Sequence, residues 1–256
     1  MQQYRGRAAT VATLTAQSCG VLHSKPMMPS TNGPIVVIDY GAGNLRSVAR
    51  ALAHVDAAPI VSADPDDIER AGGLILPGVG AAADTMRNLN ERNLVAPILR
   101  YIGQRRPFLG VCMGLQALFE SSDEGGGQQC LGVLPGVVRR FPVDRGLKVP
   151  HMGWNTVEWV RGHPVTEGIE SGSAFYFVHS FYPETPDGGL ALGTTEYGVR
   201  FPSIVARGNV VATQFHPEKS SDDGLRLYAN FVRWARSGAA CESAAALATP
   251  PQGGPR

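Results

Sequence analysis

The sequence predicts an α/β fold, with a mostly parallel sheet flanked by helices and a small antiparallel extension. In the first half of the chain, short apolar runs alternate with helical patterns, which is typical of parallel strands joined by helices. After residue 132 the pattern changes to short strands and turns, which indicates antiparallel strands. The length of 256 residues allows one sizeable core, so we expect one domain.

The parallel part begins with the apolar run at 34–41, which suits a strand covered on both faces. A helical pattern follows at 45–55. The other strands that we expect in this part are 60–62, 73–76 and 108–111. Two more helical patterns precede the last of them, at 85–89 and 94–102.

The second part of the chain carries shorter strand patterns and a final helix. The strands are expected at 137–141, 155–160, 174–178, 191–194, 203–206 and 210–214. The helix starts near Asp222 and Asp223. Its apolar residues recur at three-residue intervals and form one stripe, which we interpret as core packing: Leu225, Tyr228, Phe231 and Trp234.

Neither end of the chain has the pattern of a core element. Residues 1–33 contain basic residues, many Ala, Thr and Ser, and no acidic residue. This composition fits either an organelle transit peptide or an upstream start codon, since Met27 and Met28 stand just before the first strand. Residues 237–256 are rich in Ala, Pro and Gly. We therefore expect a folded domain at 34–236 between two disordered ends.

Charge and cysteine usage exclude several classes of function. With 23 basic and 22 acidic residues the net charge is +1, so no overall field attracts nucleic acid or an anionic membrane. The four cysteines are widely spaced and show no CxxC pattern, which favours a reducing compartment such as the cytoplasm. No apolar run approaches the roughly 18 residues of a membrane span. We expect a soluble cytoplasmic protein whose ligand is a small molecule or another protein.

The segment 108–116 carries the most informative motif. An apolar strand runs into Gly110-Val-Cys112-Met-Gly114 and then directly into a helical pattern. The glycines allow a turn too tight for side chains, so Cys112 would project at a helix N-terminus, where the dipole favours a thiolate. This is the cysteine form of a nucleophile elbow. Taken alone, the segment also fits a structural cysteine at a strand end.

A thiolate nucleophile needs a base, and the base needs a group that orients it. The segment 214–218 offers both, because a strand end presents His216 and Pro217 lets Glu218 turn back toward the imidazole. Alone, this pattern would also fit a metal ligand or a surface site. The other histidines form no His-x-His or HExxH motif, so together with Cys112 we predict a base and its orienting carboxylate.

The third segment, 76–80, is a strand end followed by glycines. Cleavage of an amide forms a tetrahedral oxyanion, which backbone N–H groups stabilise. We assign this role to the N–H groups of Met113 and Val79, with Gly78 and Gly80 beside the substrate. Without the other two motifs, the segment would be interpreted as an ordinary glycine turn.

Together the three segments resemble the class I glutamine amidotransferases, whose pattern is a Pro-Gly-x-Gly segment, a Gly-x-Cys-x-Gly-x-Gln elbow and a late His-Pro-Glu. The resemblance implies a flavodoxin-like fold, a triad of Cys112, His216 and Glu218, and hydrolysis of glutamine to glutamate and ammonia. It also implies that Gln116 and Glu124 bind the α-amino-acid end of glutamine, Glu124 through the ammonium group. This chemistry requires no metal and no organic cofactor.

Four further segments, at 39–47, 149–155, 176–180 and 214–220, are similar in sequence to one branch of that family, the glutaminase subunits of imidazole glycerol phosphate synthase. The likeness implies that Val178, His179 and Ser180 line the glutamine pocket. It implies a heterodimer with a separate (β/α)8 cyclase, which uses the ammonia to form imidazole glycerol phosphate and an aminoimidazole carboxamide ribotide in histidine biosynthesis.

The same likeness places Asn44, Trp154 and Lys219 against the partner. Other interpretations stay open, since Trp154 could be a core aromatic residue, His179 a hydrogen-bonded core histidine and Lys219 a solvated surface charge.

Three rival functions are weighed against this one. The nearest is another glutaminase, serving pyridoxal phosphate or anthranilate synthesis, and the string at 150–155 argues against it. The others are a cysteine peptidase or stress protein with a similar elbow, and a catalytically silent binding module. A complete triad with Gln116 and Glu124 argues against both.

Overall fold

One mixed sheet organises the molecule. The computed structural model describes residues 33–142 and 146–237. Within these ranges nine strands form a sheet in the order β2-β1-β3-β4-β13-β12-β11-β8-β9. The parallel strands are β1 (Ile35–Ile38), β2 (Ile60–Ser62), β3 (Gly73–Leu76), β4 (Phe108–Val111) and β13 (Val210–Thr213). The antiparallel strands are β8 (His151–Trp159), β9 (Ser173–His179), β11 (Ala191–Glu196) and β12 (Arg200–Arg207).

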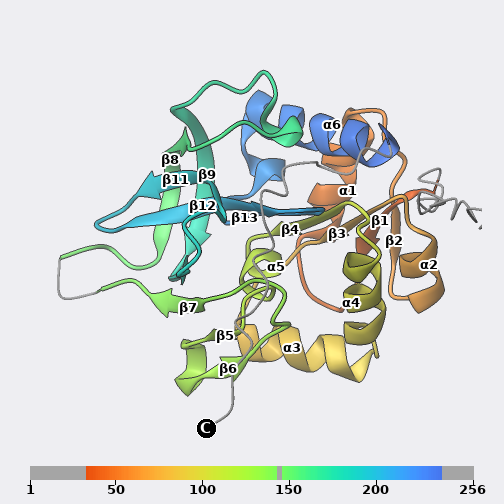
Figure 1. Cartoon of the computed structure of the whole chain (residues 1–256), viewed down its shortest axis with the longest axis horizontal. Coiled ribbons are helices and arrows are strands. Elements are labelled where there is room, and N and C mark those ends of the chain that lie inside the picture. The colour runs from red at the N-terminus through yellow and green to blue at the C-terminus, as the bar shows by residue number, and fades with distance from the viewer. Residues whose placement is uncertain (1–32, 143–145, 238–256) are drawn as a thin grey trace, which may run out of the picture.

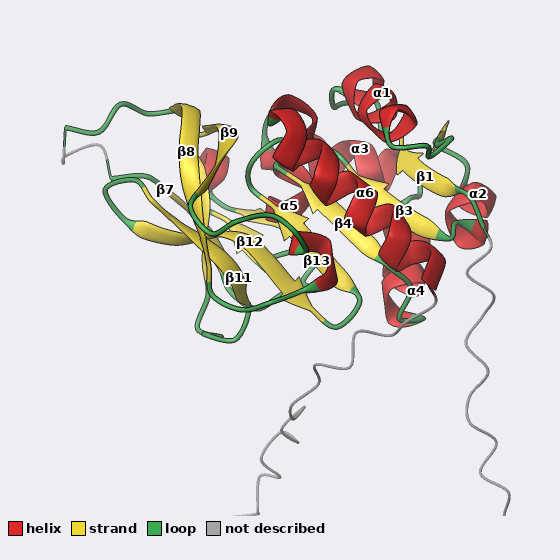
Figure 2. Cartoon of the chain, turned by 90° about the horizontal axis from the view of Figure 1, so that it is seen from above, coloured by secondary structure: helices red, strands yellow, loops and turns green. Residues whose placement is uncertain are grey.

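Helices cover both faces of the parallel half (Figure 1). The helices α1 (Leu45–His54) and α6 (Ser221–Ser237) lie on one face. The helices α2 (Pro65–Arg70), α3 (Ala82–Glu91) and α4 (Val95–Gly103) lie on the other. Seen from above, α6 runs across the parallel strands and covers them (Figure 2).

Strand β1 explains why the core has two layers. Its four residues are all buried, and successive side chains point to opposite faces of the sheet. Ile35 and Val37 belong to the layer under α1 and α6, whereas Val36 and Ile38 belong to the opposite layer. A continuous apolar run is therefore required, as the sequence indicated.

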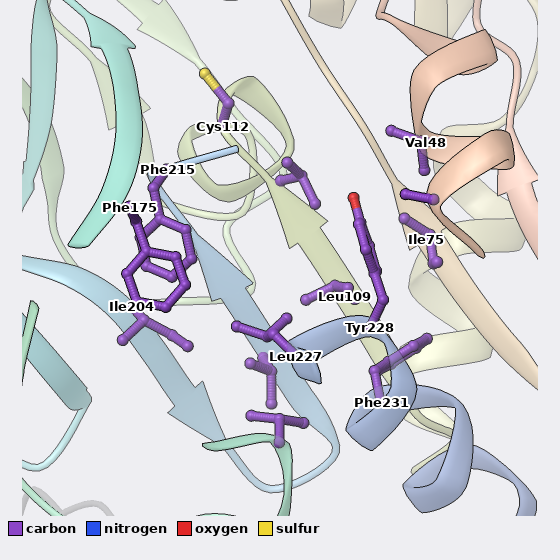
Figure 3. Close-up of a cluster of buried hydrophobic side chains, with 14 of the residues drawn as sticks. Val48, Ile75, Leu109, Cys112, Phe175, Ile204, Phe215, Leu227, Tyr228 and Phe231 are labelled. Atoms are coloured by element: carbon purple, nitrogen blue, oxygen red, sulfur yellow. The ribbon is translucent and has the colours of Figure 1, made fainter. Parts of the chain in front are cut away.

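The final helix contributes the predicted apolar stripe. Tyr228, Phe231 and Trp234 are buried, and Figure 3 shows Tyr228 and Phe231 packed beside Leu109 of β4. In the same layer the rings of Phe175 and Phe215 stack at 4.1 Å, which connects the antiparallel half to this core.

A second, smaller sheet extends the fold below β12. Its order is β10-β7-β5-β6, and β10 pairs antiparallel with β7. The strands are β5 (Ser121–Ser122), β6 (Gln128–Gln129), β7 (Val137–Arg140) and β10 (Phe181–Glu184). Only β7 was expected from the sequence. The strands β5 and β6 have two residues each, too few for a periodic pattern, and β10 contains Pro183, which argues against a strand.

The predicted α/β fold class is confirmed. The helix expected at 85–89 is longer, Ala82–Glu91. The strand expected at 210–214 among the antiparallel strands is β13, which is parallel to β4 and antiparallel to β12, so it joins the two parts of the sheet. The two ends expected to be disordered lie, apart from residues 33 and 237, outside the described residues. No helix in the described ranges is long and apolar enough to cross a membrane.

Candidate active site

Cys112 stands at the turn between β4 and the short helix α5 (Met113–Gln116). Its backbone has φ 53° and ψ −106°, a conformation that residues with side chains rarely adopt. Glycines make the turn possible: a Cβ on Gly110 would lie 2.7 Å from the carbonyl oxygen of Gly114, and a Cβ on Gly114 would lie 1.9 Å from that of Leu76. The chain therefore forms a strained elbow around a buried cysteine.

The neighbouring strand β13 leads to His216. Since β13 and β4 are parallel and adjacent, their carboxyl ends lie at one edge of the sheet. The N–H of Cys112 donates to the carbonyl oxygen of Thr213 at 2.7 Å. The N–H of His216 donates to the carbonyl oxygen of Tyr176 on β9 at 2.9 Å. These bonds fix the backbones of both residues.

His216 and Glu218 form a buried pair. Nδ1 of His216 lies 2.8 Å from Oε1 of Glu218, and the side chains are 2% and 1% exposed. The hydroxyl of Tyr228 on α6 donates to Oε2 of Glu218 at 3.5 Å. Burial raises the pKa of that hydroxyl well above its usual value, so Tyr228 stays a donor. The final helix thus supports the carboxylate that orients the imidazole.

The other ring nitrogen of His216 is directed to the cysteine. Nε2 is buried and has no hydrogen-bond partner among the described residues. Burial lowers the pKa of this imidazole, but the neighbouring Cys112 and then Glu218 outweigh burial and raise it to about 10. An imidazole that binds protons this strongly can take the thiol proton and form an imidazolium–thiolate pair.

The glycine segment 77–80 packs against the elbow. A Cβ on Gly78 would lie 2.6 Å from the Cβ of Met113 and 2.8 Å from the hydroxyl of Tyr40, so only glycine permits this approach. Gly80 has φ 93°, a conformation that favours glycine, and Val79 between them is 41% exposed. The segment therefore passes directly beside the first turn of α5.

Gln116 ends the short helix of the elbow, and two hydrogen bonds fix the orientation of its side-chain amide. Its side chain is 2% exposed, and Nε2 donates to the carbonyl oxygen of Phe181 and to Oε1 of Gln214, both at 3.1 Å. Oε1 of Gln116 is buried without a partner in the described part of the chain. Since both hydrogens are used, the atom still available is an acceptor, which suits an ammonium group.

Glu124 begins the short helix η1 (Glu124–Gly126). Its Oε2 accepts a hydrogen bond of 2.7 Å from the N–H of Ala82, the first residue of α3. The residue before that helix, Ala81, provides no side-chain cap, so Glu124 takes this role. The carboxylate therefore lies at the end of the glycine segment.

The three residues expected to line the pocket divide between the faces of β9. The ring of His179 is buried, with Nδ1 2.7 Å from the carbonyl oxygen of Phe181 and Nε2 2.9 Å from Nδ1 of His151. Its side chain is thus a hydrogen-bonded core histidine, and only its backbone can face a substrate. Val178 lies on the opposite face of β9, and Ser180 follows the strand end.

Comparison with known proteins decides the family. Residues 36–234 match the family model described as glutamine amidotransferase class-I, which is more than half of the chain. The chain belongs to the class-I glutamine amidotransferase family. It combines an α/β fold with a cysteine elbow and a late histidine.

Curated relatives give a narrower likeness. A protein from Herpetosiphon aurantiacus is 50% identical over 203 residues, covering 79% of this chain and 95% of its own length. One from Thiobacillus denitrificans is 51% identical over 211 residues, covering 78% and 91%. Both are named "Imidazole glycerol phosphate synthase subunit HisH", a name that implies a partner subunit in those synthases.

Solved structures agree on the fold. A structure titled as a glutamine amidotransferase has a TM-score of 0.61 and 22% identity, covering 78% of this chain and 98% of that one. The PurLQS structure from Thermotoga maritima has a TM-score of 0.61 and 18% identity, covering 79% and 98%.

The residues expected to face a partner lie on the surface of this amidotransferase. Trp154 on β8 is 54% exposed, so the interpretation as a core aromatic residue is wrong. Its ring meets that of Tyr176 edge-on at 6.2 Å, and Nζ of Lys219 lies 5.6 Å from the same ring. Met152, also on β8, is 61% exposed. Asn44 stands just before α1 and has no side-chain cap bond there.

Sequence reasoning missed several residues that hold this site. Tyr228 was interpreted only as core, although it also contacts Glu218. The hydroxyl of Ser220 donates to the carbonyl oxygen of His216 at 2.6 Å, and it accepts from the N–H of Tyr176 at 3.0 Å. Gln214 opens the segment 214–218, but no role was predicted for it. A polar residue at the end of a buried strand was the available signal.

Proposed function

We propose that this chain is the glutamine amidotransferase subunit of an imidazole glycerol phosphate synthase. It releases ammonia from glutamine and delivers it to a cyclase subunit. The observation that carries the proposal is the buried His216–Glu218 pair next to a strained Cys112, at the ends of two adjacent parallel strands. The 50% identity to relatives named HisH supports the choice of synthase.

In the first half of the reaction Cys112 attacks the carboxamide carbon of glutamine. The thiol proton passes to Nε2 of His216, and the thiolate forms a bond to the carbon. Negative charge develops on the carboxamide oxygen, where the N–H groups of Met113 and Val79 stabilise it. His216 then gives its proton to the leaving nitrogen, the carbon–nitrogen bond breaks, and ammonia departs.

In the second half water hydrolyses the thioester. His216 removes a proton from the water, which attacks the thioester carbon. The carbon–sulfur bond breaks and the proton returns to the sulfur, which releases glutamate and restores Cys112. Glu218 keeps the imidazole in the tautomer with Nδ1–H through both halves, because its oxygen is 2.8 Å from Nδ1.

The amino-acid end of glutamine is bound beside the elbow in this proposal. Gln116 offers its unpaired Oε1 to the substrate ammonium, and Glu124 offers a negative charge. Gly78 and Gly80 allow the substrate to approach the backbone closely. Other contacts come from Val178 and from the backbones of His179 and Ser180.

The proposed partner is a (β/α)8 cyclase that binds the face with Asn44, Trp154 and Lys219 as a heterodimer. Exposed aromatic residues are common anchors of interfaces, and Met152 extends the apolar surface. The proposal includes a functional domain at 34–236 and a reducing compartment such as the cytoplasm, since Cys112 and Cys130 are free thiols.

The test is to purify the chain with the cyclase subunit and to measure glutamate release with and without the cyclase's nucleotide ligand. We expect a stable complex, weak glutamine hydrolysis by the chain alone, and much faster hydrolysis in the liganded complex. If the chain neither binds the cyclase nor hydrolyses glutamine in its presence, the proposed function is wrong.

A further inference from the structure

Gln214 is a buried amide that has no part in the reaction described above. It follows β13, two residues before His216, and its side chain is completely buried. Its Nε2 lies 3.8 Å from Sγ of Cys112, within hydrogen-bonding distance of a sulfur atom. A polar side chain in such a place must satisfy both its donor and its acceptor.

The neighbouring groups determine which end of this amide faces the sulfur. The carbonyl oxygen of Phe181 can only accept, so Gln116 must direct its NH2 group there, at 3.1 Å. The second hydrogen of that NH2 group then needs an acceptor, which is Oε1 of Gln214 at 3.1 Å. With Oε1 occupied in this way, Gln214 can present only its NH2 group to Cys112.

The starting point of this chain of bonds is itself held firmly. The carbonyl oxygen of Phe181 also lies 2.7 Å from Nδ1 of His179, whose Nε2 lies 2.9 Å from Nδ1 of His151. His179 must donate from Nδ1 and accept at Nε2, and His151 must donate to it. A continuous chain of hydrogen bonds therefore connects the antiparallel half to the nucleophile, and only one set of histidine tautomers and amide orientations satisfies it.

We propose that Gln214 is a further catalytic residue, whose amide N–H stabilises the thiolate of Cys112. The inference rests on the proposed function, because it needs Cys112 as the nucleophile. When the thiol proton moves to Nε2 of His216, the sulfur becomes negative, and an N–H donor favours that form over the thiol. A neutral amide does this without competing for the proton.

Two substitutions separate this role from a structural one. Gln214→Leu removes both the donor and the acceptor. Gln214→Met keeps the length of the side chain and a weak acceptor for Gln116, adds no charge, and has no N–H to donate to the sulfur. If Gln214 only held Gln116 in place, the Met variant would leave the reactivity of Cys112 nearly unchanged.

The measurement is the alkylation rate of Cys112 by iodoacetamide in the full-length chain at pH 7, followed by mass spectrometry of the cysteine peptides. Because a hydrogen bond to a charged group is worth more than a neutral one, we expect at least a tenfold slower reaction in both variants. Alkylation of the half-buried Cys130 in the same samples should stay unchanged, and faster labelling there would reveal loosened structure.

Asn230→Leu is the matched control. Asn230 is another buried amide, which donates to the carbonyl oxygens of Val165 and Glu167, away from the cysteine. It should lose stability as the Gln214 variants do, but keep the wild-type alkylation rate of Cys112. If the Leu variant does not fold, the Met variant decides.

Wild-type alkylation of Cys112 in folded Gln214 variants would overturn the inference and leave the glutaminase function intact. By contrast, glutamine hydrolysis by a Cys112→Ala variant would overturn the proposed function. Gln214 would then not be a catalytic residue, whatever its effect on the alkylation of Cys112. The two failures are therefore distinguishable.

Discussion

The parallel and antiparallel halves of the sheet serve the active site in different ways. The parallel half supplies the nucleophile and the base, because the ends of β4 and β13 meet at one edge of the sheet. The backbone contacts there are so close that glycines at the elbow cannot be replaced by larger residues. The antiparallel half supplies no member of the triad. It holds the triad from outside and carries the exposed residues Met152 and Trp154.

Tyr176 on β9 is where these two tasks meet. Its carbonyl oxygen binds the N–H of His216, while its ring contacts Trp154 and lies near Lys219. A partner that touches this ring would therefore contact the residue whose carbonyl oxygen binds the N–H of the catalytic base. We expect substitutions in the parallel half to abolish glutamine hydrolysis, and substitutions in the antiparallel half to change its rate.

The largest effect is expected from Cys112→Ala. Without the sulfur no thioester forms, so glutamine hydrolysis should fall by more than about 10⁴-fold. Synthesis by the complex from added ammonium should survive, because the cyclase site is untouched. The measurements are glutamate release and ammonium-dependent product formation, with Cys130→Ala as the control that keeps both. Loss of both activities in the Cys112 variant would contradict the division of labour.

The base and its partner should differ in importance. His216→Ala removes the proton carrier, and we expect a loss of about 10⁴-fold in kcat/KM for glutamine. Glu218→Gln leaves an oxygen that can still accept from Nδ1, so the loss should be nearer 100-fold. Steady-state kinetics in the liganded complex would measure both. Wild-type kinetics of the His216 variant would remove that residue from the mechanism.

The close packing of the elbow predicts a stability effect. In Gly114→Ala the new Cβ would meet the carbonyl oxygen of Leu76, at 1.9 Å without rearrangement, so the free energy of unfolding should fall by about 3 kcal/mol. Gly103→Ala is the control, because no atom lies within 4 Å of a Cβ at Gly103. Urea unfolding compares the two, and equal stability would show that the elbow has space.

The sequence was informative for the parallel half because its signals are local. Apolar runs of the strands, the glycines at Gly110 and Gly114, and the His216–Glu218 spacing can all be recognised without knowing which strands are neighbours. The contacts of Tyr176 and Gln214 could not be predicted. They depend on β9 and β13 meeting segments that are distant in the sequence.

His179 illustrates a signal that was present but not used. The family likeness placed this residue in the pocket, yet Phe175, Phe177 and His179 alternate along β9 and share one buried face. Two phenylalanines at two-residue intervals indicate that the third side chain also points to the core. Applying strand periodicity to the motif would have separated His179 from Val178.

The buried histidines predict a pH effect on stability in the antiparallel half. Burial lowers the pKa of His179 to about 3, against about 6.5 in an unfolded chain. A lowered pKa gives stability above pH 6.5 that is lost as the pH falls, so the wild type should lose roughly 1–2 kcal/mol more than His179→Gln between pH 7 and pH 5. His216 behaves oppositely, since its raised pKa gives stability that is lost as the pH rises toward 10.

Urea unfolding at both pH values provides the measurement. His54→Gln is the control, because His54 is exposed, and this variant should follow the wild type. Equal pH dependence of the wild type and the His179 variant would mean that His179 is protonated as easily in the fold as outside it.

The smallest effect concerns the contact between the proposed partner face and the base. Lys219→Ala removes the cation near the ring of Tyr176, a contact worth about 0.5–1 kcal/mol, while the triad stays complete. The basal rate of glutamine hydrolysis should therefore change little, and the stimulation by the liganded cyclase should fall by about 3-fold to 5-fold. Arg207→Ala is the matched control, because it also removes an exposed cation. Arg207 lies opposite Val210 in the pairing of β12 with β13, at the end of β13 that is distant from His216. If the cyclase stimulated both variants equally, its effect on glutamine hydrolysis would not pass through Tyr176.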